Sequence, residues 1–196
     1  MWNYLKKAFF FLIYVVFIDM IGLAILQIGI DALEVVLAVV ALGFYLFIVA
    51  VMMFKEGQES MKKLHANDLE RVQMIKSGIP KKLETSKEYG AWKGFFIGFL
   101  TVAPLLLFIG IDLIIQACGS DFTIFKTIAN FLYLGFSCPY QCIYDGAFNG
   151  QALYYVILYA VPVMVLLCGV LYLLGARNVK AQYDSIKKRH NQIYGE

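Results

Sequence analysis

Residues 152–174 read ALYYVILYAVPVMVLLCGVLYLL, a run of 23 residues without a charged side chain. A helix needs about 20 apolar residues to cross a hydrocarbon core about 30 Å thick, so this run predicts a transmembrane helix. Residues 8–28, 32–54 and 94–117 have the same apolar character. Because lipid cannot satisfy backbone N–H and C=O groups, helices are expected in all four segments. The sequence therefore predicts an all-α integral membrane protein with four transmembrane helices.

The composition supports this prediction. Hydrophobic residues make up 61% of the 196 residues and charged residues only 16%, and the mean hydropathy is +0.70. Soluble domains carry roughly 25% charged residues. The excess apolar surface is therefore expected to face a lipid bilayer or another chain. Asp19 interrupts the first apolar run and no small-residue cleavage site appears, so this run is interpreted as a membrane helix rather than a signal peptide.

The basic residues are unevenly distributed along the chain. Of the 17 Lys and Arg residues, two precede the first span, nine lie in the loop 55–93 and five follow the fourth span. Cytoplasmic loops carry such an excess of positive charge. The pattern predicts that both termini and the loop 55–93 are cytoplasmic and that residues 118–151 form an external segment. The acidic residues expected on the external side either attract cations or reflect only that acidic groups do not resist translocation.

Two similar sequences follow the second and fourth spans. Ser60–His65 and Ser185–His190 share the pattern Ser-x-Lys-Lys-x-His at an offset of 125 residues. Each half then contains an outward helix, a return helix and a cytoplasmic extension. This organisation predicts two parallel helical-hairpin repeats related by an axis along the membrane normal. The alternative is a chance similarity between two basic segments.

Both cytoplasmic extensions are predicted to be amphipathic helices. The first is expected to end at Gly78 and Pro80. The second, residues 176–194, carries a heptad-spaced stripe that suits a partner helix. Its residues are Val179, Tyr183, Ile186, His190 and Ile193. These helices are expected to pack on each other, on a partner protein or on the lipid surface.

Four of the polar side chains within the apolar runs are candidate site residues. Asp19 lies near the middle of the first span and Gln27 near its end, whereas Asp112 and Gln116 lie one turn apart toward the outer end of the third span. A central Asp costs roughly 2.5–3.5 kcal/mol on insertion scales. Such residues line an ion or solute pathway in one interpretation. In the other, they lock helices together as hydrogen-bonded carboxyl groups.

Prolines and glycines mark further features of the third and fourth spans. Pro104 and Pro162 lie near the middle of these spans, and each is expected to kink its helix because proline removes a backbone hydrogen bond. Gly94 and Gly98 open the third span with a small-xxx-small spacing that predicts a close helix contact.

The external segment is predicted to form an interfacial or re-entrant structure. Residues 122–136 are apolar but too short to span, which predicts one helix in the outer interface or dipping into the bundle. Cys118, Cys138 and Cys142 are expected outside, where a disulfide between two of them is plausible.

The sequence contains no recognisable catalytic motif, metal site or cofactor site, and topology explains its basic residues better than nucleic acid does. Two functions compete. The first is a non-enzymatic accessory or regulatory subunit of a membrane complex. The second is a small oligomeric channel or transporter that uses the membrane-embedded Asp residues. Four spans rarely enclose a pathway, so a homo-oligomer or a complex with another membrane protein is expected.

Overall fold

The computed structural model describes residues 2–25, 27–28, 31–79, 83, 85, 88–119, 124–143 and 150–194. Every element in this described part is a helix. The six helices are α1 (Trp2–Ile25), α2 (Asp31–Ser77), α3 (Lys93–Ala117), α4 (Ile124–Leu132), α5 (Leu134–Ile143) and α6 (Gly150–Tyr194).

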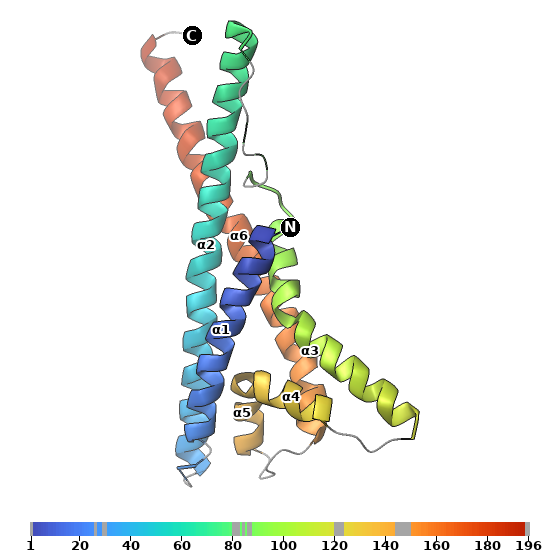
Figure 1. Cartoon of the computed structure of the whole chain (residues 1–196). Coiled ribbons are helices and arrows are strands. Elements are labelled where there is room, and N and C mark those ends of the chain that lie inside the picture. Colours follow the sequence, from blue (N-terminus) through green and yellow to red (C-terminus); the bar gives the residue numbers. More distant parts are fainter. Residues whose placement is uncertain are drawn as a thin grey trace.

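Four of these helices, α1, α2, α3 and α6, are long and apolar enough to cross a membrane. The prediction of four such helices is confirmed. Helices α2 and α6 contain 47 and 45 residues. At 1.5 Å per residue each is about 70 Å long, more than twice the thickness of a hydrocarbon core. Both helices therefore continue from an apolar run into a charged extension, and the two extensions project beyond the start of α1 and α3 (Figure 1).

The extension of α2 ends where the sequence predicts. Its last residue is Ser77, and Gly78 adopts a φ of 71°. The Gly78 N–H donates to the Met74 carbonyl at 2.9 Å, which closes the last turn. Glycine favours this left-handed conformation because it has no Cβ. Pro80 lies outside the described residues.

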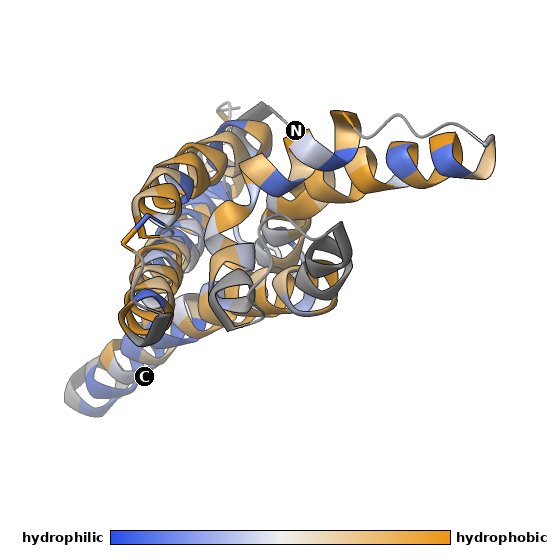
Figure 2. Ribbon diagram, turned by 90° about the horizontal axis from the view of Figure 1, so that it is seen from below, coloured by the Kyte–Doolittle hydropathy of each residue, from blue (hydrophilic) through white to orange (hydrophobic). Residues whose placement is uncertain are grey.

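All six helices contribute to one apolar core. Each supplies at least one side chain that is at most 4% exposed, and these include Phe11, Tyr45, Leu105, Ala129, Phe136 and Met164. By contrast, many large apolar side chains on the long helices remain exposed, among them Phe47 and Leu107. Figure 2 shows hydrophobic residues along the ribbons of the long helices. This outward apolar surface is the one expected to face lipid.

The short helices α4 and α5 lie between α1 and α3, toward the end opposite the extensions (Figure 1). The predicted single helix over residues 122–136 was wrong, because α4 and α5 are separate helices that meet at Tyr133. The Tyr133 side chain is fully buried, and its hydroxyl donates to the Thr101 carbonyl of α3 at 2.6 Å. This hydrogen bond fixes the junction of the two helices against α3.

Glycines bring α2 and α6 into backbone contact. A Cβ added to Gly57 would overlap the Tyr172 carbonyl oxygen, and one added to Gly175 would overlap the Phe54 carbonyl oxygen. The contact is reciprocal, since each glycine faces the carbonyl three residues before the other glycine. Only glycine permits so close an approach of two helices.

The predicted glycine face of α3 packs on α6. A Cβ at Gly94 would lie 2.6 Å from the Tyr172 Cβ, and one at Gly98 would lie 2.7 Å from the Met164 carbonyl oxygen. The expected close contact at the start of α3 is therefore confirmed, and α6 is its partner.

Gly175→Ala is expected to destabilise the protein by about 1–3 kcal/mol, because the added Cβ meets backbone atoms that cannot rotate away. Gly43→Ala in α2 is the matched control, because a Cβ there meets nothing within 4 Å. Thermal unfolding in detergent, followed by circular dichroism, measures both. Equal unfolding midpoints for the two variants would contradict the close contact.

Candidate functional site

Asp19 is the single acidic residue of α1 (Trp2–Ile25), and 1% of its surface is exposed. It lies six residues, or about 9 Å, before the end of the helix at Ile25. Its Oδ1 atom accepts a hydrogen bond from the Gly135 N–H of α5 at 2.5 Å. Among the described residues, its Oδ2 atom has no hydrogen-bond partner. The carboxyl group therefore holds one short helix and keeps one oxygen for a further partner.

A second contact fixes the register of α5 on α1. The Cys138 thiol donates to the Gly22 carbonyl at 3.8 Å, one turn beyond the Asp19 contact on both helices. Both contacts join residues 116 apart in sequence, so α5 runs parallel to α1. A Cβ at Gly135 would overlap the Ile18 side chain, so a glycine is required here. Sequence periodicity did not reveal this pairing.

Asp112 is equally buried, but its contact is local. Gln116, one turn further along α3, donates through Nε2 to the Asp112 Oδ2 atom at 2.7 Å. The Asp112 Oδ1 atom has no partner among the described residues. The structure thus joins these two predicted site residues. Gln27 is exposed in the turn after α1 and takes no part in either contact.

The other predicted residues in the membrane segments remain only partly tested. Pro104 and Pro162 lie inside the unbroken helices α3 and α6, and the kinks stay a prediction. Cys118 is exposed and Cys138 is buried. The Cys142 side chain lies outside the described part, so a disulfide of the external segment also stays a prediction.

Among the described side chains of the stripe on α6, Val179 and Tyr183 meet α2. Val179 is buried with Met61, and the Tyr183 ring lies over His65 with ring centroids 4.3 Å apart. Ile186, the next stripe residue, is 64% exposed. The side chains of His190 and Ile193 lie outside the described part. The two extensions therefore pack together near the membrane segments and present apolar side chains further out.

The extension of α2 likewise has both exposed apolar side chains and side chains that contact another segment. The apolar side chains of Leu69, Val72 and Ile75 are all exposed, with Ile75 at 83%. On the other side, Glu88 connects the segment before α3 to α2. Its Oε1 atom accepts from Asn67 at 2.7 Å and from Arg71 at 2.6 Å. The hydrogen bond from Asn67, together with Arg71, lowers the pKa of Glu88.

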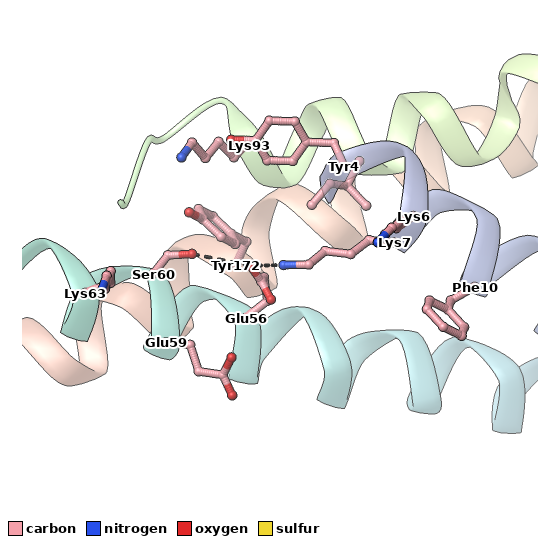
Figure 3. A pocket seen from close by; sticks show the side chains of 11 residues that line it. Tyr4, Lys6, Lys7, Phe10, Glu56, Glu59, Ser60, Lys63, Lys93 and Tyr172 are labelled. Carbon is pink, nitrogen blue, oxygen red and sulfur yellow. Dashed lines mark hydrogen bonds and ion pairs between the residues drawn. The ribbon is translucent and has the colours of Figure 1, made fainter. Parts of the chain in front are cut away.

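A polar cavity of about 540 Å³ lies where α1 and α3 begin, against α2 and α6 (Figure 3). The Lys7 ammonium of α1 forms an ion pair with Glu56 of α2 inside it. Lys93, the first residue of α3, also lines the cavity, and its ammonium donates to the Glu88 carbonyl oxygen. No sequence pattern predicted this cavity, because its lining residues come from four helices.

The described residues contain no group of three or more His, Cys, Asp or Glu side chains placed to hold a metal ion. The four long apolar helices define the class of the chain as a helical integral membrane protein. No family model matches the sequence, no curated protein is similar to it, and no solved structure matches its fold.

Glu88→Gln is expected to lower the midpoint of thermal unfolding at pH 7 by about 2–4 °C, because the amide gives up the charge-assisted bond to Arg71. The pKa of Glu88 is lowered on folding. The stability that ionised Glu88 contributes to the folded protein is therefore complete above the unfolded pKa of about 4.3. It is lost as the pH falls through the lower folded pKa.

The difference between the wild type and Glu88→Gln should accordingly disappear in acid. Scans from pH 7 to pH 3 measure it, with the exposed Asp184→Asn in α6 as a control that should shift little at any pH. A Glu88→Gln difference that stays constant over this range would contradict the pKa argument.

Proposed function

We propose that this protein is a non-enzymatic accessory or regulatory subunit of a membrane complex, and that the two helical extensions bind its partner. The observation that carries this proposal is the apolar surface left uncovered on both extensions. Leu69, Val72 and Ile75 of α2 and Ile186 of α6 are each between 49% and 83% exposed. Uncovered apolar stripes at helical spacing are typical of helix-binding surfaces.

The position of these side chains favours a protein partner over the lipid surface. Ile75 lies 21 residues after Phe54, the last residue of the predicted second span, which is about 30 Å along the continuous helix α2. Ile186 lies 12 residues, or about 18 Å, beyond the predicted fourth span on α6. Because both helices project past the start of α1 and α3 (Figure 1), these side chains lie away from the apolar belt.

Charge restricts the class of partner further. The outer part of the α6 extension carries Lys187, Lys188 and Arg189, and all three residues are exposed. A partner helix with an apolar stripe flanked by acidic side chains would be complementary to this surface. A second copy of the chain, whose extension is equally basic, is less suited to it.

The proposal includes a finer architecture. The reciprocal contact of Gly57 and Gly175 supports two parallel repeats, because it has the local symmetry of a twofold axis. These glycines are 118 residues apart and the Ser-x-Lys-Lys-x-His sequences 125 apart. The seven-residue difference is two helical turns, which keeps the same helix face.

The buried contacts of α5 with α1 support a re-entrant hairpin, and the basic loop supports cytoplasmic termini.

Ile186→Glu and Ile75→Glu are expected to reduce the recovered partner at least tenfold, because each places a carboxylate on the apolar stripe. The tagged full chain is extracted gently from its own host membrane, and native mass spectrometry identifies stoichiometric partners. A clean homo-oligomer in the wild type would contradict the accessory role.

Gln192→Glu in α6 and Gln73→Glu in α2 are the matched controls. Each adds the same charge to the same helix at an exposed position that points about 120° or more away from the substituted isoleucine, at about 100° per residue. The controls should retain the partner. Equal loss with stripe and control variants would mean that charge alone, rather than the stripe, governs association.

A second candidate is an oligomeric channel or transporter, and one observation favours it. Asp19 and Asp112 each keep one buried carboxyl oxygen without a hydrogen-bond partner among the described residues. Membrane-embedded acids with spare acceptors are characteristic of ion and proton pathways.

Under this second function, Asp19→Asn and Asp112→Asn are expected to abolish ion flux in proteoliposomes while the protein still folds. Asparagine keeps the acceptor oxygen for the Gly135 N–H but removes the ionisable group. Size-exclusion chromatography checks folding, and a fluorescent pH or ion indicator measures flux. Normal flux in both variants would leave the acids with a structural role alone.

A further inference from the structure

The polar cavity at the start of α1 and α3 is rich in positive charge. Lys6, Lys7, Lys63 and Lys93 line it, together with the carboxylates of Glu56 and Glu59. The lining therefore carries two more ammonium groups than carboxylates. The Lys7–Glu56 ion pair spans from α1 to α2 across the cavity (Figure 3). A cavity of this charge favours an anion.

Neutral hydrogen-bonding groups also line the cavity, beside the apolar side chains of Phe10 and Ile97. Ser60 of α2, Tyr172 of α6 and Tyr4 of α1 bring three hydroxyl groups to the same cavity. Lys93 opens α3, so the positive end of that helix dipole also lies at the cavity. Ammonium and hydroxyl donors together suit the oxygen atoms of a phosphate group. A phosphomonoester carries a charge of about −1.5 to −2 near pH 7, which matches the excess of two ammonium groups.

An apolar groove of about 690 Å³ adjoins this cavity. It runs between α1 and α3 and is lined by Phe9 and Leu12 on one side and by Ala103, Pro104 and Leu107 on the other. Lys6 lines both the groove and the cavity, so the two meet there. From Leu100 to Leu107 the groove follows about 10 Å of helix. A free phosphate ion has no apolar part that could occupy such a groove.

We propose that the cavity binds the phosphomonoester headgroup of an anionic phospholipid and that the groove holds one of its acyl chains. The headgroup lies where the apolar runs of α1 and α3 begin, which is the level of lipid phosphates. The hydrocarbon chain then follows α1 and α3 toward Leu107. This site is separate from the exposed stripes of the extensions, so its failure would leave the proposed subunit role untouched.

Trp92 supplies a reporter for this site. Its ring packs against Tyr4, which lines the cavity, with ring centroids 6.0 Å apart. The chain has two tryptophans, so the full-length Trp2→Phe protein carries Trp92 as its single indole. In detergent micelles this protein is titrated with dioleoyl phosphatidic acid, with zwitterionic dioleoyl phosphatidylcholine, and with inorganic phosphate. Trp92 fluorescence measures binding.

Phosphatidic acid is expected to give a saturable change, and Lys63→Glu to weaken its apparent affinity about tenfold or more. Lys62→Glu is the control, because Lys62 is the neighbouring exposed lysine and does not line the cavity. It should change the affinity less than about twofold. Equal losses with both variants, or an equal response to phosphatidylcholine, would overturn the proposal.

Ala103→Phe tests the acyl chain, because the larger side chain fills the groove without adding an indole. It should weaken phosphatidic acid binding, whereas Ile114→Phe, at an exposed position of α3 outside the groove, should not. If inorganic phosphate gives the same response as the lipid and Ala103→Phe has no effect, the cavity takes a free anion and the lipid assignment is wrong. Each variant is first checked for a monodisperse elution profile.

Discussion

Helices α2 and α6 touch backbone to backbone where Gly57 faces the Tyr172 carbonyl and Gly175 faces the Phe54 carbonyl. The crossing falls directly after the apolar run of each helix, at the boundary between the membrane segment and the extension. On one side of it the two helices enclose the common core with α1, α3, α4 and α5. On the other side the described side chains pack together as far as Val179 and Tyr183, and the described apolar side chains beyond them are exposed. One contact thus determines both the bundle and the surface proposed for a partner.

The polar cavity follows from the same crossing. Gly94 and Gly98 hold the start of α3 on α6, so Lys93 lies close to Tyr172. The ion pair of Lys7 with Glu56 holds the start of α1 on α2, one residue before Gly57. Charged residues that flank the apolar runs are therefore gathered into one partly open cavity. A dispersed positive charge would attract anionic lipids only weakly, whereas a clustered one can recognise a single headgroup.

Sequence patterns within a single helix predicted the features that depend on neighbouring residues. The four apolar helices, the glycine contact at the start of α3 and the helix end at Gly78 all depend on residues close together in sequence. Periodicity missed the contacts between distant residues. Gly57 and Gly175 stand in no small-xxx-small pattern, and the Asp19 contact with Gly135 joins residues 116 apart. The break between α4 and α5 was missed because it is fixed by the hydrogen bond of Tyr133 to α3.

The contact of Asp19 with α5 gives a physical reason for an acid in an apolar helix. Gly135 lies in the first turn of α5, where backbone N–H groups have no partner within the helix. Because α5 begins among buried residues, water cannot supply the missing acceptor, and an unpaired N–H there would be costly. Asp19 supplies that acceptor from α1 and also places an acidic group at the positive end of the helix dipole. The oxygen of a neutral amide could also accept this hydrogen bond, so the contact itself requires an acceptor oxygen at this position, and a negative charge would strengthen it through the dipole.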